Sequence, residues 1–326
     1  MYNSKTVAVV VPAFREELQI GNVLSTMPQW VDYVFVVDDA SPAPDTTFEI
    51  AMSYGQRDHR VRAIRRPVNG GVGAAIETGY IAAIEVNAQI VCVMAGDGQM
   101  DPDDLEEIVK PVACGRADYS KANRLSLSDD WKIVPTVRLF GNIVLSFLTR
   151  FSTGYWNISD AQSGFTAASN ELVKVFIKRG IYPRYGVPND LLVKCSVAGS
   201  RVVDVPTRPR YGVGEQSKLK PRRVALPILW ILIRGFVQRV FVRYIVKEAN
   251  PVPIAYLSGF LSFTIGLLWS AILITRSIQG KISSPEAIAA SLLFVGGSIL
   301  ITLAVVLDVL FCYIVGNVIK NNETLD

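Results

Sequence analysis

The feature that most constrains this chain lies near its C-terminus, where two long stretches are almost free of charge. Residues 254–275 contain no charged side chain, and residues 288–318 contain one, Asp308. Each stretch is long enough for a transmembrane helix, because about 20 residues cover the hydrocarbon core of a bilayer. Residues 276–286 form a short connector, so we expect residues 251–326 to be a two-span membrane hairpin with both chain ends on the same side. Asp308 would be costly within the second span unless its side chain faces a partner or a polar cavity, or reaches the membrane interface near a helix end.

An apolar segment rich in arginine, residues 221–250, precedes these spans. Arg234, Arg239 and Arg243 would each cost a few kcal/mol at mid-membrane, so we expect amphipathic helices at the interface rather than a further crossing. Basic residues crowd this part of the chain: Lys218, Lys220, Arg222, Arg223, Arg234, Arg239, Arg243 and Lys247. The positive-inside rule then places this side of the chain, with residues 1–220, in the cytoplasm, although a solvated basic helix face would have the same composition.

Charge and cysteine content exclude several classes of protein. The formal net charge of +4 is too small by itself to indicate nucleic acid binding. The cysteines are isolated, which indicates neither a zinc site nor a disulfide framework and fits a reducing cytosol: Cys92, Cys114, Cys195 and Cys312. The first residues lack the features of a signal peptide, so we expect the bulk of the protein to stay in the cytosol.

Residues 1–220 alternate between β-rich and helix-like segments. The expected strands are residues 6–11, 33–37, 61–64, 89–94 and 201–205. The expected helices are residues 18–27, 46–54, 73–86, 102–114, 138–151, 172–179 and 188–198. This alternation predicts an α/β domain with a mostly parallel, Rossmann-like sheet that is covered on both faces and binds ligands at the carboxyl ends of its strands.

Acidic and glycine-rich segments follow several of these strands. Asp38 and Asp39 end a buried strand, where they either accept hydrogen bonds from a nucleoside or only start a turn. The glycine-rich run at residues 67–75 leads into a helix, which is typical of anion binding but also of close packing. Asp97 and Gln99 offer oxygen ligands to a hard cation that also grips a diphosphate.

These features, in this order, resemble glycosyltransferase family two, whose catalytic domain has the GT-A fold. The first of them is V-V-V-P-A-F-R-E-E at residues 9–17. S-D-A-Q-S-G-F at residues 159–165 and G-E-Q-S-K-L at residues 214–219 are similar to segments of the polyprenyl-phosphate branch, which includes dolichol-phosphate mannose synthases and bactoprenol glucosyltransferases. With the membrane hairpin, the resemblance covers essentially the whole chain.

The resemblance implies a donor site on the first half of the domain. The nucleotide-sugar-binding residues it implies are Pro12, Ala13, Glu16, Asp38, Asp39, Asn69, Gly70, Gly73 and Asp97. Asp97 and Gln99 match the second acid and the glutamine of the family's D-x-D-x-Q motif, which holds Mg²⁺ or Mn²⁺. Ala95 stands in place of the first acid, which weakens the expected metal site because affinity depends on ligand charge.

The resemblance also implies an acceptor site for a lipid phosphate. Arg124 and Arg138 match the arginines that hold the phosphate, and Asn142 stands where a serine is usual, although structural ion pairing would also explain the arginines. Ser217 and Lys218 belong to the loop that closes over the donor, and Lys218 and Asp97 would assist departure of the nucleoside diphosphate. Asp160 matches the acid that the family has beside the reaction centre, and we expect this catalytic residue to act by positioning and partial charge stabilisation.

Three further polar residues, Asn189, Asp190 and His59, have a weaker connection to the expected reaction. Asn189 and Asp190 lie where the branch often has an acid at a helix start, which is also an ordinary N-cap position. The single histidine, His59, has no triad partners in sequence. Acid–base chemistry would therefore rest on carboxylates, and little is needed because a phosphate monoester is mostly a dianion at pH 7.

The expected activity is inverting transfer of a hexose, glucose from UDP-glucose, to a polyprenyl phosphate at the cytoplasmic membrane face. Mannose transfer from GDP-mannose is an alternative, and so is an inactive transferase-like scaffold, which Ala95 and Asp308 suggest. A processive synthase is disfavoured, because two spans leave no translocation channel. The expected partners are a nucleotide sugar, a polyprenyl phosphate and the membrane, with no nucleic acid and with a homodimer or homotetramer as the assembly.

Overall fold

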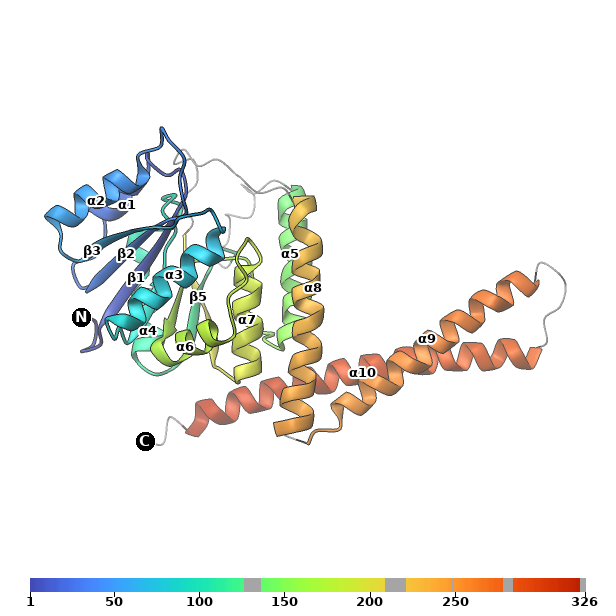
Figure 1. Ribbon diagram of the computed structural model, residues 1–326. Coiled ribbons are helices and arrows are strands. Elements are labelled where there is room, and N and C mark those ends of the chain that lie inside the picture. The colour runs from blue at the N-terminus through green and yellow to red at the C-terminus, as the bar shows by residue number, and fades with distance from the viewer. Residues whose placement is uncertain (126–135, 209–220, 248, 278–283, 323–326) are drawn as a thin grey trace. The chain divides into compact units, whose positions relative to one another are not determined.

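The computed structural model describes residues 1–125, 136–208, 221–247, 249–277 and 284–322. The chain divides into two compact units, Met1–Phe236 and Val237–Asp326. The first unit contains the sheet and most of the helices, and the second contains a long helical hairpin (Figure 1).

A seven-stranded sheet forms the centre of the first unit, with the order β3-β2-β1-β4-β6-β5-β7. Its strands are β1 Val7–Ala13, β2 Tyr33–Asp38, β3 Val61–Arg65, β4 Ile90–Val93, β5 Tyr119–Asn123, β6 Thr166–Ser169 and β7 Val202–Pro206. Among these strands β6 alone runs antiparallel to its neighbours. The predicted α/β fold with a mostly parallel sheet is therefore confirmed.

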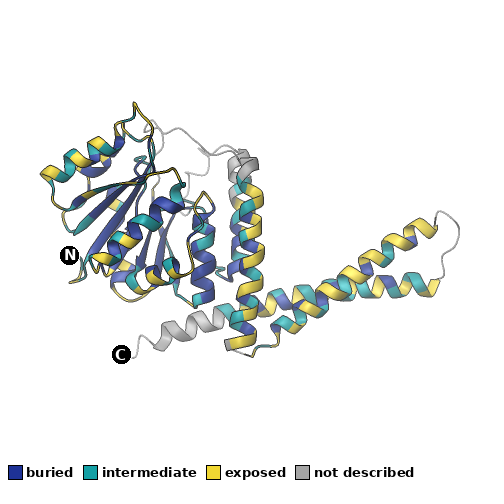
Figure 2. Cartoon of the chain, in the orientation of Figure 1, coloured by how far each residue is buried: buried dark blue, intermediate teal, exposed yellow. Residues whose placement is uncertain are grey.

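Helices cover both faces of this sheet. They are α1 Ile20–Ser25, α2 Thr47–Arg57, α3 Val72–Glu85, η1 Pro102–Asp104, α4 Leu105–Ala113, α6 Asn170–Lys178 and α7 Val187–Ala198. The helix α5 Thr136–Thr153 packs against α7, and α8 Pro221–Arg239 packs against α5, where the Ser152 hydroxyl donates to the Leu232 carbonyl. Val9 and Val11 of β1 pack with residues of α1, α2 and α4, whereas Ala8 and Val10 pack with residues of α3, α6 and α7. The central strands are therefore buried on both faces, as the dark blue strands of Figure 2 show.

Two strands were not predicted from the sequence. The strand β5 has the sequence Y-S-K-A-N, and the strand β6 has the sequence T-A-A-S. Lysine, asparagine and small residues interrupt the apolar signal, so neither stretch has the pattern typical of a buried strand. Tertiary pairing, rather than local preference, makes them strands.

Helix α3 lies unusually close to β1 because a glycine faces the strand. A Cβ atom at Gly79 would lie 2.2 Å from Cγ1 of Val10. No side chain fits at that distance, so the glycine sets the spacing between helix and sheet.

We predict that Gly79→Ala destabilises the protein by about 1 to 3 kcal/mol, because the added methyl forces α3 away from β1. Gly141→Ala is the matched control, since a Cβ there meets nothing within 4 Å, and it should be neutral or stabilise by up to about 1 kcal/mol. Denaturant unfolding of the detergent-solubilised chain measures both, and equal stabilities would contradict the close-approach argument.

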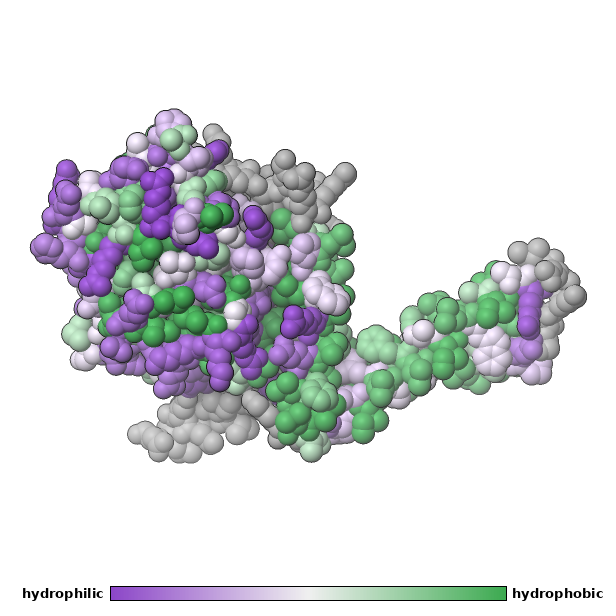
Figure 3. Space-filling model, in the orientation of Figure 1, coloured by the Kyte–Doolittle hydropathy of each residue, from purple (hydrophilic) through white to green (hydrophobic). Residues whose placement is uncertain are grey.

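The second unit contains η3 Val240–Lys247, α9 Val252–Ser277 and α10 Ser284–Asn322. Glycines bring α9 and α10 together, since a Cβ at Gly266 would lie 2.4 Å from the backbone nitrogen of Phe294, and one at Gly297 would lie 2.3 Å from that of Phe263. Close backbone approach through small residues is typical of packed membrane helices. The outer surface of the pair is largely apolar (Figure 3).

Among the residues that the structure describes, three helices, not two, are long and apolar enough to cross a membrane: Val224–Val246, Val252–Ser277 and Ser284–Cys312. The predicted two-span topology is therefore wrong. An odd number of crossings puts the two ends on opposite sides of a membrane, so the predicted common side for both ends no longer follows.

Part of the error came from treating Arg239, one of the three arginines of the first helix, as an isolated charge. Arg239 is fully buried, and its Nη1 and Nη2 donate to Oδ1 and Oδ2 of Asp308 at 2.8 and 2.7 Å. The hydroxyl groups of Tyr244 and Tyr256 also donate to the Asp308 carboxylate. Asp308 thus faces a partner, and the charge that was expected to exclude the segment from the bilayer is neutralised within the protein.

We predict that Arg239→Leu lowers the stability of the protein by about 3 to 5 kcal/mol, because it leaves the Asp308 charge buried without its cation. The double variant Arg239→Leu/Asp308→Leu should recover most of this loss. Arg276→Leu is the control, because the Arg276–Glu286 pair is exposed and 3.9 Å long. Thermal unfolding in detergent compares them, and equal losses for Arg239→Leu and the double variant would refute the pairing argument.

Candidate active site

The carboxyl ends of β1, β2 and β4 bring predicted donor-site residues to one edge of the sheet. Ala13 pairs with Asp38 in register, and the Asp39 N–H donates to the Ala13 carbonyl at 2.9 Å. The N–H of Gly96, in the segment after β4, donates to the Pro12 carbonyl at 3.1 Å. Parallel pairing therefore places the predicted nucleotide-binding positions side by side.

Asp39 organises the glycine-rich loop. Its carboxylate accepts hydrogen bonds from the N–H groups of Gly70 at 3.0 Å and Gly71 at 2.7 Å, and it also pairs with Arg66. The Asn69 side chain donates to the Asp39 carbonyl at 3.0 Å. These loop N–H groups, which the sequence suggested for anion binding, donate in this structure to a carboxylate of the chain itself.

Asp38 stabilises the turn that follows β2. Its side chain is fully buried, and its carboxylate accepts from the Ser41 N–H at 3.2 and 3.3 Å. Arg65 lies 3.4 Å away and balances the charge. Of the two adjacent acids, Asp38 holds the turn and Asp39 holds the loop that follows β3.

Gly73 packs against a segment that the sequence did not identify, residues 181–186. The Gly73 N–H donates to the Pro183 carbonyl at 2.8 Å, and a Cβ at Gly73 would lie 1.9 Å from the Tyr182 carbonyl oxygen. The Asp190 carboxylate accepts from the Tyr182 N–H at 2.8 Å and so fixes this segment. No local pattern reveals it, because the contact joins positions far apart in sequence.

Glu16 lies beside the same segment. Burial, and then the negative charge of Glu16, raise the pKa of the Tyr185 hydroxyl. The Glu16 N–H donates to the Thr47 hydroxyl at 2.8 Å, which holds the start of the segment after β1. Tyr185 is thus a neighbour of the predicted donor-site residue Glu16 that sequence reasoning missed.

Asp97 and Gln99 form a tight turn after β4. Asp97 Oδ1 accepts from the Gln99 N–H at 3.1 Å, and Gly98 between them has a φ of 74°. Among the described residues no group of three or more His, Cys, Asp or Glu side chains could hold a metal ion. One carboxylate and one amide fit a cation of the Mg²⁺ type only when substrate phosphates complete its shell.

Asp160 and Arg124 form a two-point ion pair at the carboxyl end of β5. Arg124 Nε donates to Asp160 Oδ2 at 2.7 Å, and Nη2 donates to Oδ1 at 3.1 Å. Asp160 is 1% exposed. Burial by itself would raise the pKa of Asp160, but the charge and hydrogen bonds of Arg124, with a contribution from Lys121, lower it to about 2. Asp160 is therefore ionised at neutral pH.

A small cavity of about 40 Å³ joins the predicted donor and acceptor sides. Its lining comprises Gln99, Met100, Asp101, Asp104, Ala122, Arg124, Ser163, Phe165, Thr207 and Arg208. Gln99 belongs to the predicted metal motif and Arg124 to the predicted phosphate site. Burial raises the pKa of Asp104, which accepts from the Arg208 N–H at 3.2 Å. Donor-side and acceptor-side residues thus share one cavity wall.

Four predicted acceptor-side or loop residues are not placed at the level of side chains. Arg138 and Asn142 lie on α5, whose backbone is described there but whose side chains at these positions are not. Ser217 and Lys218 lie outside the described residues. Their roles remain predictions.

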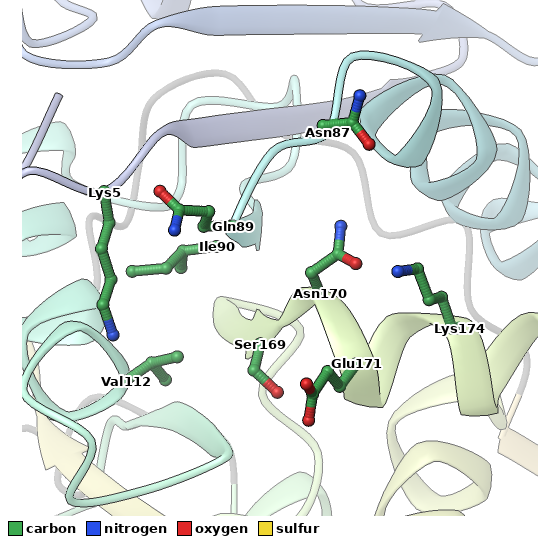
Figure 4. Close-up of a pocket in the computed structure, with 9 residues that line it drawn as sticks. All are labelled: Lys5, Asn87, Gln89, Ile90, Val112, Ser169, Asn170, Glu171 and Lys174. Carbon is green, nitrogen blue, oxygen red and sulfur yellow. The ribbon is translucent and has the colours of Figure 1, made fainter.

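A larger cavity of about 330 Å³ lies at the opposite edge of the sheet (Figure 4). Lys5 and Gln89 precede β1 and β4, whereas Ser169 ends the antiparallel strand β6. Antiparallel pairing sends the end of β6 to the edge where its neighbours begin. This cavity therefore lies at the edge of the sheet opposite to the one where Asp39 follows β2 and Asp97 follows β4.

The chain belongs to glycosyltransferase family 2. The family model, described as Glycosyl transferase family 2, matches residues 8–176. An uncharacterised protein of Methanocaldococcus jannaschii is 32% identical over 240 residues, which are 73% of this chain and 94% of the relative. The UDP-N-acetylglucosamine–dolichyl-phosphate N-acetylglucosaminyltransferase of Methanococcus voltae is 29% identical, over 64% of this chain and 86% of its own length. The undecaprenyl-phosphate mannosyltransferase of Micrococcus luteus is 26% identical, over 61% and 82%.

A solved structure shows the same fold. Glucosyl-3-phosphoglycerate synthase of Mycobacterium tuberculosis, in complex with Mn²⁺ and UDP-glucose, matches with a TM-score of 0.52 and 20% identity, over 72% of this chain and 79% of its own. The match confirms the GT-A-like fold that the motifs predicted.

We predict that Asp160 stabilises the folded state by about 2 kcal/mol at neutral pH. A depressed pKa makes this contribution complete above the ordinary value of 3.8, and it is lost as the pH falls towards about 2. Asp160→Asn should therefore flatten this part of the curve of unfolding free energy against pH. Asp118→Asn is the control, because the Asp118–Arg201 pair is more exposed. If the unfolding free energy of the wild type did not change between pH 3.8 and about 2, the stabilising role of Asp160 would be refuted.

Proposed function

We propose that this protein transfers a hexose from a nucleoside diphosphate sugar to the phosphate of a polyprenyl lipid, with inversion at the anomeric carbon. The observation that carries the proposal is the cavity lined by both Gln99 and Arg124, on a family 2 domain whose chain continues into apolar helices. Relatives named as dolichyl-phosphate and undecaprenyl-phosphate transferases support this class of acceptor.

On the donor side, Pro12, Ala13, Glu16 and Asp39 hold the nucleoside. The loop containing Asn69, Gly70 and Gly73 shapes the wall of the site, because Asp39 and the Pro183 carbonyl fix its N–H groups. Asp97 and Gln99 would hold Mg²⁺ or Mn²⁺ together with the donor diphosphate. A cation bound there would supply positive charge to offset the negative charge that develops on the leaving diphosphate.

On the acceptor side, Arg124 holds the lipid phosphate together with Arg138, Asn142 and Ser217. The Asp160 carboxylate fixes the guanidinium plane of Arg124 through two hydrogen bonds. Because the pKa of Asp160 is about 2, Asp160 is a weak base and acts by orientation and charge. A phosphate dianion attacks without a strong general base, and attack from the face opposite the leaving group inverts the anomeric centre.

Glucose from UDP-glucose is the hexose we propose, in keeping with the resemblance to bactoprenol glucosyltransferases. Mannose from GDP-mannose is the second candidate, which the mannosyltransferase of Micrococcus luteus favours.

We predict that the purified protein converts labelled UDP-glucose and polyprenyl phosphate into a lipid-linked sugar, and that Asp97→Asn lowers the rate by about 100-fold, because the cation and diphosphate lose a ligand. Glu107→Gln is the matched control on an exposed face of α4 and should stay within about 2-fold of the wild type. Thin-layer chromatography of the lipid fraction measures the product.

A panel of nucleotide sugars decides the donor in the same assay. Product with GDP-mannose alone would select mannose. No product with any nucleotide sugar, together with no metal-dependent binding of UDP or GDP by calorimetry, would support the inactive scaffold and refute the transferase.

A further inference from the structure

Two buried charges lie directly behind Asp160. Lys121 of β5 and Asp204 of β7 are register partners on neighbouring parallel strands. The Lys121 side chain is fully buried and that of Asp204 is 10% exposed. A buried lysine is costly unless its charge is paired and its protons are hydrogen-bonded, so its position needs a physical reason.

Both side chains bind the turn that carries Asp160. Lys121 Nζ donates a hydrogen bond to the Asp160 backbone carbonyl, and Asp204 Oδ2 accepts from the Ser159 N–H at 2.6 Å. Lys121 Nζ also lies 4.0 Å from Asp204 Oδ1, an atom with no hydrogen-bond partner among the described residues. The pair therefore grips two consecutive residues of the turn, one through its N–H and the other through its carbonyl.

The buried charges alternate in sign from the sheet to the site. Their order is Asp204, Lys121, Asp160 and Arg124. Burial lowers the pKa of Lys121 and raises that of Asp204, and each partner opposes the shift of the other. Lys121 also lowers the pKa of Asp160, after the larger effect of Arg124.

We propose that Lys121 and Asp204 are positioning residues for the transfer reaction: they clamp the Ser159–Asp160 turn so that the Asp160 carboxylate meets Arg124 at both oxygens. This inference rests on the proposed function and deepens it. Both side chains are buried and contact the backbone of the turn, so they act on the reacting groups only through Asp160.

Other contacts hold the rest of this turn, so removal of the clamp need not unfold it. The Asn157 side chain donates to the Val202 carbonyl at 3.0 Å, and the Ala161 N–H donates to the Ser146 hydroxyl at 3.3 Å. Lys121 and Asp204 add the contacts at Ser159 and Asp160, which lie between these anchors. Their removal should therefore displace Asp160 more than the segment around it.

Three variants separate positioning from folding. Lys121→Met removes the charge and the donor at similar length, and it should lower kcat by about 100-fold while KM for the nucleotide sugar stays within about 2-fold, because a displaced group costs rate. Asp204→Asn keeps an acceptor for the Ser159 N–H. The double variant Lys121→Met/Asp204→Asn leaves no uncompensated charge, so its thermal stability should recover relative to Lys121→Met while kcat stays low.

A double-mutant cycle with Asp160→Asn is the decisive readout. If Lys121 acts through Asp160, Lys121→Met should lower kcat little further in the Asp160→Asn background. An equal loss in both backgrounds, or a kcat that returns together with stability in Lys121→Met/Asp204→Asn, would overturn the proposal.

Failure of the proposed function gives a different result, because the wild type would then transfer no sugar to polyprenyl phosphate. In that case unfolding free energy against pH still tests the clamp. Lys121→Met should begin to lose the Asp160 contribution at a higher pH than the wild type does, since the carboxylate loses a nearby cation. An unchanged acid limb would refute the coupling.

Discussion

Parallel pairing of β1 with β2 and β4 is the constraint on which the candidate site depends. These strands are buried on both faces, and a slip by one residue would turn every side chain to the opposite face and disrupt the packing of both cores. Their shared direction brings Ala13, Asp38 and Asp97 to one edge. The antiparallel strand β6 then returns the chain, so that the turn carrying Asp160 precedes it at this same edge.

Buried charges in this protein occur with partners of opposite sign. Asp160 with Arg124 belongs to the candidate site, whereas Arg239 with Asp308 belongs to the helical unit. An ion removed from water is tolerated only when a partner and hydrogen bonds replace its hydration. The cost that disfavours an isolated arginine in a bilayer therefore does not apply to a paired one, so Arg239 does not count against the first apolar helix as a candidate span.

The fold and the site make separate contributions to the functional argument. Family membership and the GT-A-like fold are shared by enzymes that use different sugars and acceptors, so neither one identifies the substrate. The cavity lined by Gln99 and Arg124 is more specific evidence for the substrates. It brings an amide of the predicted donor side and a guanidinium of the predicted acceptor side to one wall. The apolar helices add a reason for a lipid acceptor, whose headgroup is confined to the membrane surface.

The sequence by itself determined the alternation of strands and helices, the order of the motifs and two of the three apolar spans, because periodicity and long apolar runs are local properties. It missed β5 and β6, whose residues become strands only by pairing. Tertiary structure decided the partners: Asp39 binds glycine N–H groups, Lys121 meets Asp204, and Arg239 meets Asp308 from a position 69 residues away. Such contacts join positions remote in the chain, so no local pattern encodes them.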